Sequence, residues 1–489
     1  MGATGEASAC PCCVDHSQSP RANRLKAPVP PIKIKLKRNF TTMGKLFGTD
    51  GIRGKANAYP LTADMATIIG RATALFFTQP DTNRPPVIVL GRDTRESGEM
   101  LEEAFSRGAC SAGANVLLTS VLPTPGIACL TVAQKADVGV VISASHNPYT
   151  DNGFKFFDDN GHKLSENQET ELERIILELE NDSPVSDGTG PGRAEPLSDA
   201  GHAYIDFLKQ AVSAGPDKPL KLVLDCANGA TAHIAGKIFP DAHLLFNTPD
   251  GININNQCGS EHPEVLAKTV TDTGADAGFA FDGDGDRVIA IDEAGKQLTG
   301  DQLLAFSAEY LKNTGQLKNN TMVSTVMSNI GLSQALTDMG IEHIKTPVGD
   351  RHVAEAMRSV GASLGGEDSG HTIFGDFQTT GDSLLAALMV CRIMRETGRS
   401  LYDLAQCMKV YPQVLINVEV REKPKIETIP EICTAIDTVT AELGDSGRVL
   451  VRYSGTQSIC RVMVEGPEEE QTMKYAEQIA EAVQMALGA

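Results

Sequence analysis

Short runs of β-branched residues alternate along this chain with longer stretches whose apolar residues recur at helical spacing. Short apolar runs bounded by turn residues predict buried strands, and the longer periodic stretches predict helices. The first such series comprises strand 87–91, helix 98–113, strand 115–119, strand 138–142 and helix 166–180. Ser165 is placed to cap the last of these helices. A strand–helix alternation of this kind predicts an α/β domain.

The same rhythm recurs twice and then changes. A second α/β unit begins at the predicted strand 220–226, and a third begins near Asp301 and contains the predicted strand 322–327. Beyond Tyr411 the predicted order is strand 414–420, helix 430–443, strands 449–453 and 459–465, and helix 468–487. The fold class is therefore predicted to be α/β, with four domains: three similar α/β domains and a C-terminal α+β domain around a central cleft.

These units set the expected domain bounds at 43–197, 198–300, 301–410 and 411–489. Within the first, residues 181–198 are rich in Pro, Gly, Asp and Ser and are interpreted as a linker. Residues 1–42 differ from the rest, with seven Lys/Arg against two acidic residues and prolines at 28, 30 and 31. We expect them to be a disordered extension, with Met43 as a candidate start.

A polar turn follows the buried strand 138–142. It contains Ser143, Ser145 and His146, and Lys155 lies a short loop further on. An open α/β sheet binds its ligands at the carboxyl ends of its strands. A serine there, beside basic side chains, suits the holding or transfer of an anionic group. An ordinary Ser/Asn/Pro turn remains open as the alternative.

A second loop carries three carboxylates, Asp282, Asp284 and Asp286, which alternate with glycines between two predicted strands. Carboxylates held this close repel one another unless a cation lies between them, and hard oxygen ligands favour Mg²⁺ or Ca²⁺. An EF-hand is rejected because Arg287 occupies the position that needs glycine and because the flanks are not helical. The remaining alternative is a solvated acidic turn.

Two further loops suit a sugar phosphate. The glycine-rich turn 364–371 presents Glu367, Ser369 and His371 for hydrogen bonds to sugar hydroxyls. The C-terminal hairpin 449–464 offers forked guanidinium donors, hydroxyls and backbone N–H groups from Arg452, Ser454, Gly455, Thr456 and Arg461. The residues of the hairpin 449–464 therefore predict a phosphate-binding site, called here the phosphate cradle. A common glycine-rich polar turn is the alternative for 364–371, and a surface hairpin with scattered arginines is the alternative for 449–464.

Composition narrows the class of protein. A net charge of −20 argues against nucleic acid and anionic membrane as partners, and no apolar run reaches the ~18 residues of a membrane span. Single cysteines within apolar patterns are interpreted as reduced core residues: Cys110, Cys129, Cys226, Cys391, Cys433 and Cys460. The spacing of Cys10, Cys12 and Cys13 with His16 matches no closed zinc motif.

Together these loops resemble one family, the α-D-phosphohexomutases. The resemblance begins at Lys45-Leu-Phe-Gly-Thr-Asp-Gly-Ile-Arg-Gly54 and runs to the C-terminus. It includes Gly91-Arg-Asp-Thr-Arg-Glu-Ser97, Thr124-Pro-Gly126 and Thr346-Pro-Val-Gly-Asp-Arg351. The Phe-Gly-Thr-Asp-Gly opening and the Ser-Ala-Ser-His-Asn-Pro-Tyr turn are most similar to the glucosamine branch of the family.

The resemblance implies a role for each candidate. It implies that Ser145, rather than Ser143, becomes phosphoserine, and that one Mg²⁺ binds to Ser145, Asp282, Asp284 and Asp286. It implies transfer-site roles for Arg53, His146, Lys155 and Arg287, sugar recognition by Glu367, Ser369 and His371, and distal phosphate binding by Arg452, Ser454, Gly455, Thr456 and Arg461. Gln457 and Ser458 depart from the usual Glu-Pro, and Asp368 from a frequent Gln.

The activity implied is that of an isomerase, which interconverts glucosamine 6-phosphate and glucosamine 1-phosphate through a phosphoserine enzyme and a bisphosphorylated sugar. A sugar 1,6-bisphosphate serves as activator and intermediate, and the product feeds UDP-N-acetylglucosamine and peptidoglycan synthesis in the cytoplasm. The resemblance also suggests a homodimer, and first phosphorylation by a kinase or by the enzyme itself. His146, His371 and Lys155 stay unranked as proton carriers. A phosphoglucomutase or phosphomannomutase remains open, as does a non-catalytic sugar-phosphate binder.

Overall fold

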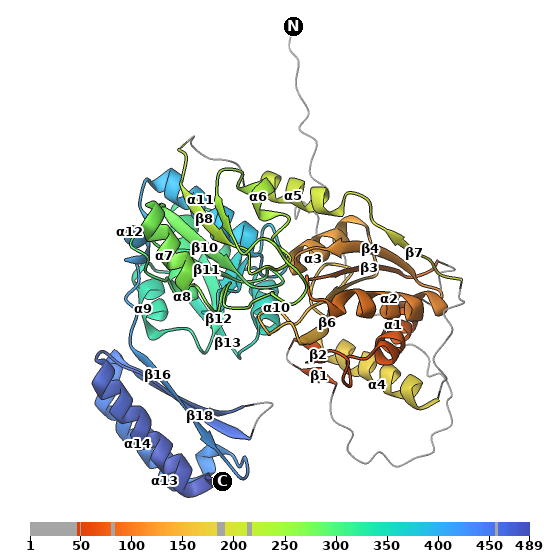
Figure 1. Cartoon of the computed structure of the whole chain (residues 1–489). Coiled ribbons are helices and arrows are strands. Elements are labelled where there is room, and N and C mark those ends of the chain that lie inside the picture. The colour runs from red at the N-terminus through yellow and green to blue at the C-terminus, as the bar shows by residue number, and fades with distance from the viewer. Residues whose placement is uncertain (1–45, 49, 80–83, 183–190, 213–217, 455–457) are drawn as a thin grey trace.

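The computed structural model describes residues 46–48, 50–79, 84–182, 191–212, 218–454 and 458–489 (Figure 1). The predicted N-terminal extension and its cysteines therefore lie outside the described residues, as do Gly455 and Thr456 of the predicted phosphate cradle. No helix in the described part of the chain is long and apolar enough to cross a membrane.

The N-terminal domain is built on a seven-stranded sheet with the order β1-β2-β6-β5-β3-β4-β7. Its strands are β1 (Phe47–Gly48), β2 (Gly51–Lys55), β3 (Val87–Arg92), β4 (Asn115–Val121), β5 (Val138–Ile142), β6 (Asp151–Asp158) and β7 (Ala194–Pro196). Its helices are α1 (Ala63–Phe77), α2 (Ser97–Ser111), α3 (Thr124–Ala133) and α4 (Glu166–Asp182). The predicted cap is present, since Ser165 Oγ accepts from the Gln168 amide at 3.4 Å.

Alternating apolar residues of the central strands face two helical layers. On β3, Ile88 and Leu90 pack into the core formed with α1, α2 and α4, while Val89 packs on the opposite face with α3. Figure 1 shows these layers above and below the orange sheet. The strand 138–142 was predicted correctly and is buried at every residue, as the central strand of an α/β sheet should be.

The interpretation of 181–198 as a linker was wrong at two points. Helix α4 continues to Asp182, and Ala194–Pro196 forms β7, which pairs in parallel with β4. Every residue of β7 is exposed, so its sequence carries no apolar run from which a strand could be inferred. Backbone pairing at the sheet edge creates this strand.

The second and third domains each contain a four-stranded mixed sheet, with the orders β11-β10-β8-β9 and β13-β12-β14-β15. The second domain comprises α5 (Ala200–Ala211), β8 (Leu222–Asp225), α6 (Ala235–Ile238), β9 (His243–Leu245), α7 (Glu264–Thr273), β10 (Ala277–Phe281) and β11 (Val288–Ile291). The third comprises α8 (Gly300–Asn313), η1 (Lys318–Asn320), β12 (Thr321–Thr325), α9 (Ile330–Asp338), β13 (Glu342–Thr346), α10 (Asp350–Val360), β14 (Leu364–Gly366), β15 (Thr372–Phe374), α11 (Ser383–Thr397) and α12 (Leu401–Ala405).

The C-terminal domain is a three-stranded antiparallel sheet, β16-β18-β17, with helices α13 and α14 packed against it. Its elements are β16 (Gln413–Glu419), η2 (Ile426–Thr428), α13 (Pro430–Leu443), η3 (Gly444–Ser446), β17 (Arg448–Tyr453), β18 (Ile459–Glu465) and α14 (Glu469–Leu487). This order of elements confirms the predicted α+β unit. The domain has a hydrophobic core of its own.

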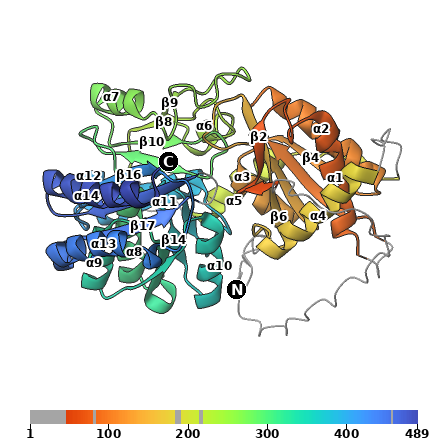
Figure 2. The ribbon, with the colours of Figure 1, turned by 90° about the horizontal axis from the view of Figure 1, so that it is seen from below.

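The hydrophobic core of the C-terminal domain is separate from the core that joins the other three domains. One continuous core extends from α3 of the first domain through the second to α11 and α12 of the third. The C-terminal domain instead joins the third through polar contacts, in which the Arg448 guanidinium donates to Val326 O at 2.9 Å and to Ser328 O at 2.5 Å. Figure 2 shows the blue C-terminal domain lying over the third domain and away from the first.

The eight cysteines among the described residues are all free thiols. Five of the six that were predicted as core residues are buried, and Cys433 is the exception because it is half-buried on α13.

Candidate active site

Ser145 lies at the carboxyl end of β5 in a strained backbone conformation, with φ at 54°. Left-handed backbone is disfavoured for residues other than glycine and is found at functional sites. Ser145 is 1% exposed. Its hydroxyl donates to Asp282 Oδ2 at 2.7 Å and lies 3.3 Å from His146 Nδ1. The serine loop of the first domain therefore meets the acidic loop of the second.

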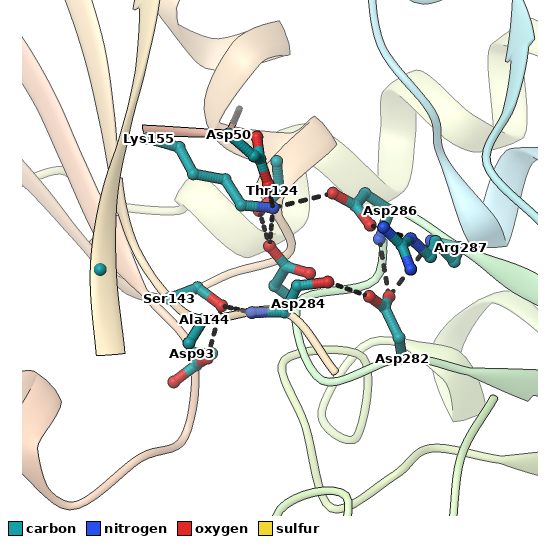
Figure 3. A network of polar contacts seen from close by, with 12 residues as sticks. Asp50, Asp93, Thr124, Ser143, Ala144, Lys155, Asp282, Asp284, Asp286 and Arg287 are labelled. Carbon is teal, nitrogen blue, oxygen red and sulfur yellow. Dashed lines mark hydrogen bonds and ion pairs between the residues drawn. The ribbon is translucent and has the colours of Figure 1, made fainter. Parts of the chain in front are cut away.

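The acidic loop is the turn between β10 and β11, and it folds back on its own first carboxylate. Asp282 Oδ1 accepts from the amides of Asp286 and Arg287, both at 3.1 Å. Gly285, with φ at +72°, supplies the left-handed residue that the turn requires. Ligand oxygens of the three buried aspartates lie within 4.8 Å of one another. The predicted convergence of the three carboxylates is present (Figure 3).

The three aspartates fit a hard divalent cation. Asp284 Oδ1 and Asp286 Oδ1 are buried without a hydrogen-bond partner, which is costly for an ionised carboxylate and leaves both oxygens available as ligands. The candidate metal ligands at this point are all oxygen atoms, including Ser145 Oγ, and Mg²⁺ and Ca²⁺ prefer oxygen ligands. Asp282, Asp284 and Asp286 could therefore hold a metal ion.

Lys155 is the buried cation that faces this acidic loop. It lies in β6, a short loop after Ser145 as expected, and its ammonium is 2.6 Å from Asp284 Oδ2, 2.9 Å from Asp286 Oδ2 and 3.4 Å from Asp50 Oδ2. Burial opposes its charge, yet the three carboxylates together raise the pKa of Lys155 well above its usual value. Lys155 therefore keeps its positive charge within the acidic loop that faces Ser145.

The aspartates respond differently to the same surroundings. Burial, followed by repulsion from Asp286 and Asp284, raises the pKa of Asp282 well above its ordinary value. Burial acts in the same direction on Asp286, but the charges of Lys155, His371 and Arg287 together outweigh it and lower the pKa of that carboxyl. The negative charge of Asp282, the carboxylate that faces the Ser145 hydroxyl, is therefore less well compensated by nearby cations than that of Asp286.

His146 and Arg287 lie on the other side of the serine. Arg287 Nη1 is 3.2 Å from His146 Nδ1, the same ring nitrogen that faces Ser145 Oγ. Burial, and then the charge of Arg287, lowers the pKa of His146, so the ring is neutral at pH 7 and Nδ1 acts as an acceptor. Arg53 Nη1 donates to Ala144 O at 3.5 Å, which places the fourth predicted transfer residue at the same loop.

The predicted sugar loop is the turn of the β14–β15 hairpin. Glu367 Oε1 accepts from the Gly349 amide at 3.1 Å, and His371 Nε2 lies 3.3 Å from both the Gly381 amide and Asp350 Oδ2. Ser369 is exposed. Asp350 also pairs with Lys163, which pairs in turn with Asp50 of the first domain. The third loop therefore joins the same polar network as the first two.

The predicted phosphate cradle lies on the C-terminal domain. Arg452 and Arg461 are direct partners across the β17–β18 ladder. Burial, and then repulsion from Arg461, lowers the pKa of Arg452. Arg461 Nε is buried without a hydrogen-bond partner and Ser454 is buried beside it in the hairpin. Two like charges held side by side favour an anion between them. The described side-chain contact of Arg452 to another domain is with Met327 Sδ, at 3.9 Å.

Several site residues were missed by reasoning from the sequence. Thr124 donates to Asp284 Oδ2 at 2.6 Å, and Asp93 accepts from Ser143 Oγ at 2.6 Å (Figure 3). Thr124, Asp93, Asp50 and Asp350 all lie in motifs that carried the family resemblance, so a signal for them existed. Lys163 had none, because its two carboxylate partners come from distant parts of the chain.

Comparison with known proteins agrees with this arrangement in all four domains. Family models for phosphoglucomutase/phosphomannomutase match in order: α/β/α domain I at residues 44–183, domain II at 202–295, domain III at 299–411 and the C-terminal domain at 415–482. The fold class is thereby confirmed as that of a phosphohexomutase.

Two curated relatives and two solved structures place the chain more closely. It is 52% identical over 451 residues to phosphoglucosamine mutase of Syntrophus aciditrophicus, covering 91% of this chain and all of that protein. It is 47% identical over 450 residues to phosphoglucosamine mutase of Geobacillus kaustophilus, with the same coverage. A phosphoglucomutase/phosphomannomutase family protein from Burkholderia thailandensis superposes with a TM-score of 0.73 at 24% identity, over 92% of this chain and 100% of that one. Aspergillus fumigatus N-acetylphosphoglucosamine mutase, solved with GlcNAc-6P and magnesium, gives 0.64 at 19%, over 91% and 96%. The chain belongs to the phosphohexomutase family, in its bacterial phosphoglucosamine mutase branch, and is an isomerase.

Proposed function

We propose that this enzyme interconverts glucosamine 6-phosphate and glucosamine 1-phosphate, with Ser145 as the phosphoryl carrier. The observation that carries the proposal is the buried contact of Ser145 Oγ with Asp282 Oδ2, at 2.7 Å, within an aspartate cluster that has unpartnered oxygens. The curated relatives named phosphoglucosamine mutase support glucosamine as the sugar. Glucosamine 1-phosphate would then supply UDP-N-acetylglucosamine and peptidoglycan synthesis in the cytoplasm.

In the proposed reaction, phosphoserine transfers its phosphoryl group to a sugar hydroxyl. The bond from Ser145 Oγ to phosphorus breaks and a bond from the sugar oxygen to phosphorus forms. The proton of the sugar hydroxyl passes to a base, and an acid returns a proton to Ser145 Oγ. The bisphosphorylated sugar then reorients, and its other phosphoryl group returns to Ser145 by the reverse steps. Such transfer depends on positioning and on stabilisation of charge, rather than on elaborate covalent chemistry.

The surroundings of the three proton-carrier candidates favour His146. Its neutral ring accepts at Nδ1, 3.3 Å from Ser145 Oγ, so it can take the serine proton when a phosphoryl group is transferred to that oxygen and return the proton in the reverse step. Lys155 is held charged by its carboxylates, so it suits stabilisation of the moving phosphoryl group. His371 contacts Asp350 and Gly381, and this favours a role in orienting the sugar.

One Mg²⁺ would be held by Asp282, Asp284, Asp286 and an oxygen of phosphoserine, and when bound it neutralises charge at the phosphoryl group. Arg53 and Arg287 would face the same group. At the distal end, Arg452, Ser454 and Arg461, together with Gly455 and Thr456, would hold the phosphate that does not react. Because the C-terminal domain has its own core and polar attachments, it is suited to move as substrate enters and leaves.

Further parts of the proposal concern assembly and priming. Glu367 and Ser369 would bind sugar hydroxyls beside His371. The functional domains would span 43–197, 198–300, 301–410 and 411–489. A sugar 1,6-bisphosphate, a kinase or the enzyme itself would first phosphorylate Ser145, and the enzyme would act as a homodimer.

A coupled assay on three substrates tests the proposed function. Glucosamine 6-phosphate should be converted best with Mg²⁺, and EDTA or Ser145→Ala should abolish turnover, while Ser143→Ala should keep Ser145 phosphorylation. A preference for glucose 1-phosphate or mannose 1-phosphate would instead make the chain a phosphoglucomutase or phosphomannomutase. Absence of turnover on all three by protein phosphorylated at Ser145 would leave only a sugar-phosphate binder.

A further inference from the structure

The backbone on either side of the catalytic serine is held by two side chains that do not face the reacting atoms. Arg95 Nη2 donates to Ser145 O and to Asn147 O, both at 2.8 Å. Asn255 Nδ2 donates to the same two carbonyls, at 2.9 and 3.0 Å. Two NH₂ groups and two carbonyl oxygens thus form a closed ring of four hydrogen bonds. Each NH₂ group uses both of its hydrogens in the ring.

The two donors come from different domains. Arg95 belongs to the first domain, is fully buried and is fixed by its ion pair with Asp93, at 2.8 Å. Asn255 lies between β9 and α7 of the second domain, where its own φ of 57° directs it to the serine loop. The ring therefore ties the serine loop to the domain that carries the aspartate cluster.

The acidic loop is shaped around this ring. A Cβ atom on Gly283 would lie 2.7 Å from Asn255 Nδ2 and 2.7 Å from Ser145 O, closer than real Cβ contacts. Gly283 separates Asp282 from Asp284, so glycine at this point lets the carboxylates approach the serine loop closely. The ring, the serine and the aspartates are packed as one unit.

We infer that Asn255 is a positioning residue for phosphoryl transfer, acting through the carbonyls of Ser145 and Asn147. The left-handed backbone of Ser145 aims Oγ at Asp282, and this conformation is disfavoured unless its surroundings impose it. Asn255 imposes it from across the domain boundary, and so fixes the nucleophile relative to the aspartates that face it. Asn255 Nδ2 donates to the backbone carbonyls of Ser145 and Asn147 and not to the Ser145 hydroxyl. This inference rests on the proposed role of Ser145.

Asn255→Asp tests the inference most sharply because the two side chains have the same shape. Aspartate offers no donor and turns an oxygen toward two carbonyl oxygens, so the ring opens and the carbonyls are repelled. Asn256→Ala is the matched control, since Asn256 is the exposed next residue of the same loop. Each protein is measured for kcat and KM on glucosamine 6-phosphate, for the rate at which glucose 1,6-bisphosphate phosphorylates Ser145, and for Tm.

We expect Asn255→Asp to slow both Ser145 phosphorylation and kcat on the order of 10²-fold, the scale of a small misplacement of reacting groups, with KM close to that of Asn256→Ala. Tm should fall only modestly, because Arg95 still donates to the same two carbonyls. Asn255→Ala, which removes the donors without adding repulsion, should show a smaller loss in the same two rates. Wild-type rates in both variants, or a loss that only follows the fraction unfolded, would overturn the inference. If wild-type protein itself is never phosphorylated on Ser145, the proposed function fails instead.

Discussion

Replacing Lys155 with methionine should destabilise the enzyme strongly when divalent cations are absent. Lys155 is 1% exposed and lies within 3.4 Å of three carboxylates, two of which are almost fully buried. Methionine fills similar volume but leaves Asp284 and Asp286 without their main counter-charge. Removing one partner of a buried ion pair costs about 3–5 kcal/mol, so we expect a loss of that size in the free energy of unfolding in EDTA.

Mg²⁺ should restore part of this loss, because a cation bound by the aspartates supplies the missing positive charge. Urea unfolding followed by circular dichroism, in EDTA and in excess Mg²⁺, measures both effects. Lys155→Met combined with Asp284→Asn should recover part of the stability in EDTA, since one of the unpaired charges is removed with the lysine.

Lys268→Met is the matched control, because Lys268 pairs with Asp272 on an exposed helix face. A surface pair of this kind contributes about 0–1 kcal/mol, and Mg²⁺ should not change the result. If Lys155→Met loses less than about 1 kcal/mol of unfolding free energy in EDTA, as a surface pair would, then Lys155 is not the main counter-charge of the buried aspartates. Equal losses in EDTA and Mg²⁺ would refute the shared site for lysine, aspartates and metal.

Three further predictions concern residues around the site. Burial, and then the charge of Asp368, raises the pKa of Asp301 to about 8. The protonated carboxyl therefore contributes its full stability below the unfolded pKa of ~3.9, and this contribution is lost as pH rises toward about 8. Asp301→Asn should flatten the curve of Tm against pH in this range, and an unchanged slope would argue against the raised pKa. Glu465 is fully buried, and its Oε2 accepts from Ile330 N at 3.0 Å and from Arg448 Nε at 2.5 Å. Glu465→Ala should lower the free energy of unfolding, measured by calorimetry, by roughly 1–3 kcal/mol. It should also raise KM because the C-terminal domain is held less firmly, and an unaltered KM would argue against that coupling. Gly283→Ala places a methyl group 2.7 Å from Ser145 O and should lower kcat by roughly tenfold or more, while Gly201→Ala, with its nearest neighbour at 3.7 Å, should leave kcat unchanged in the same assay.

The sequence predicted the parts of the fold whose burial follows a clear period. Strand 138–142, helix 430–443 and strand 459–465 have the predicted bounds, because each carries apolar residues at the spacing that its element buries. Strand β7 was missed because all of its residues are exposed.

The individual loops of the candidate site could be predicted from the sequence, but the contacts between residues of different loops could not. Spacing alone indicated that three aspartates converge, since glycines between them allow a tight turn. It could not indicate that Lys155 would face Asp284 and Asp286, residues 129 and 131 positions away. Asn255 carried no signal at all, because an isolated asparagine in a turn is ordinary until the fold brings it to the serine loop.

A single-turnover experiment shows whether Ser145 carries the phosphoryl group. Enzyme phosphorylated on Ser145, as verified by intact mass and site mapping, is mixed with glucosamine 6-phosphate and Mg²⁺ and then quenched. We expect the phosphate to leave Ser145 and appear on a glucosamine bisphosphate as fast as or faster than kcat, and Ser145→Ala never to acquire it. If phosphate stays on Ser145 while turnover proceeds, Ser145 is not the phosphoryl carrier.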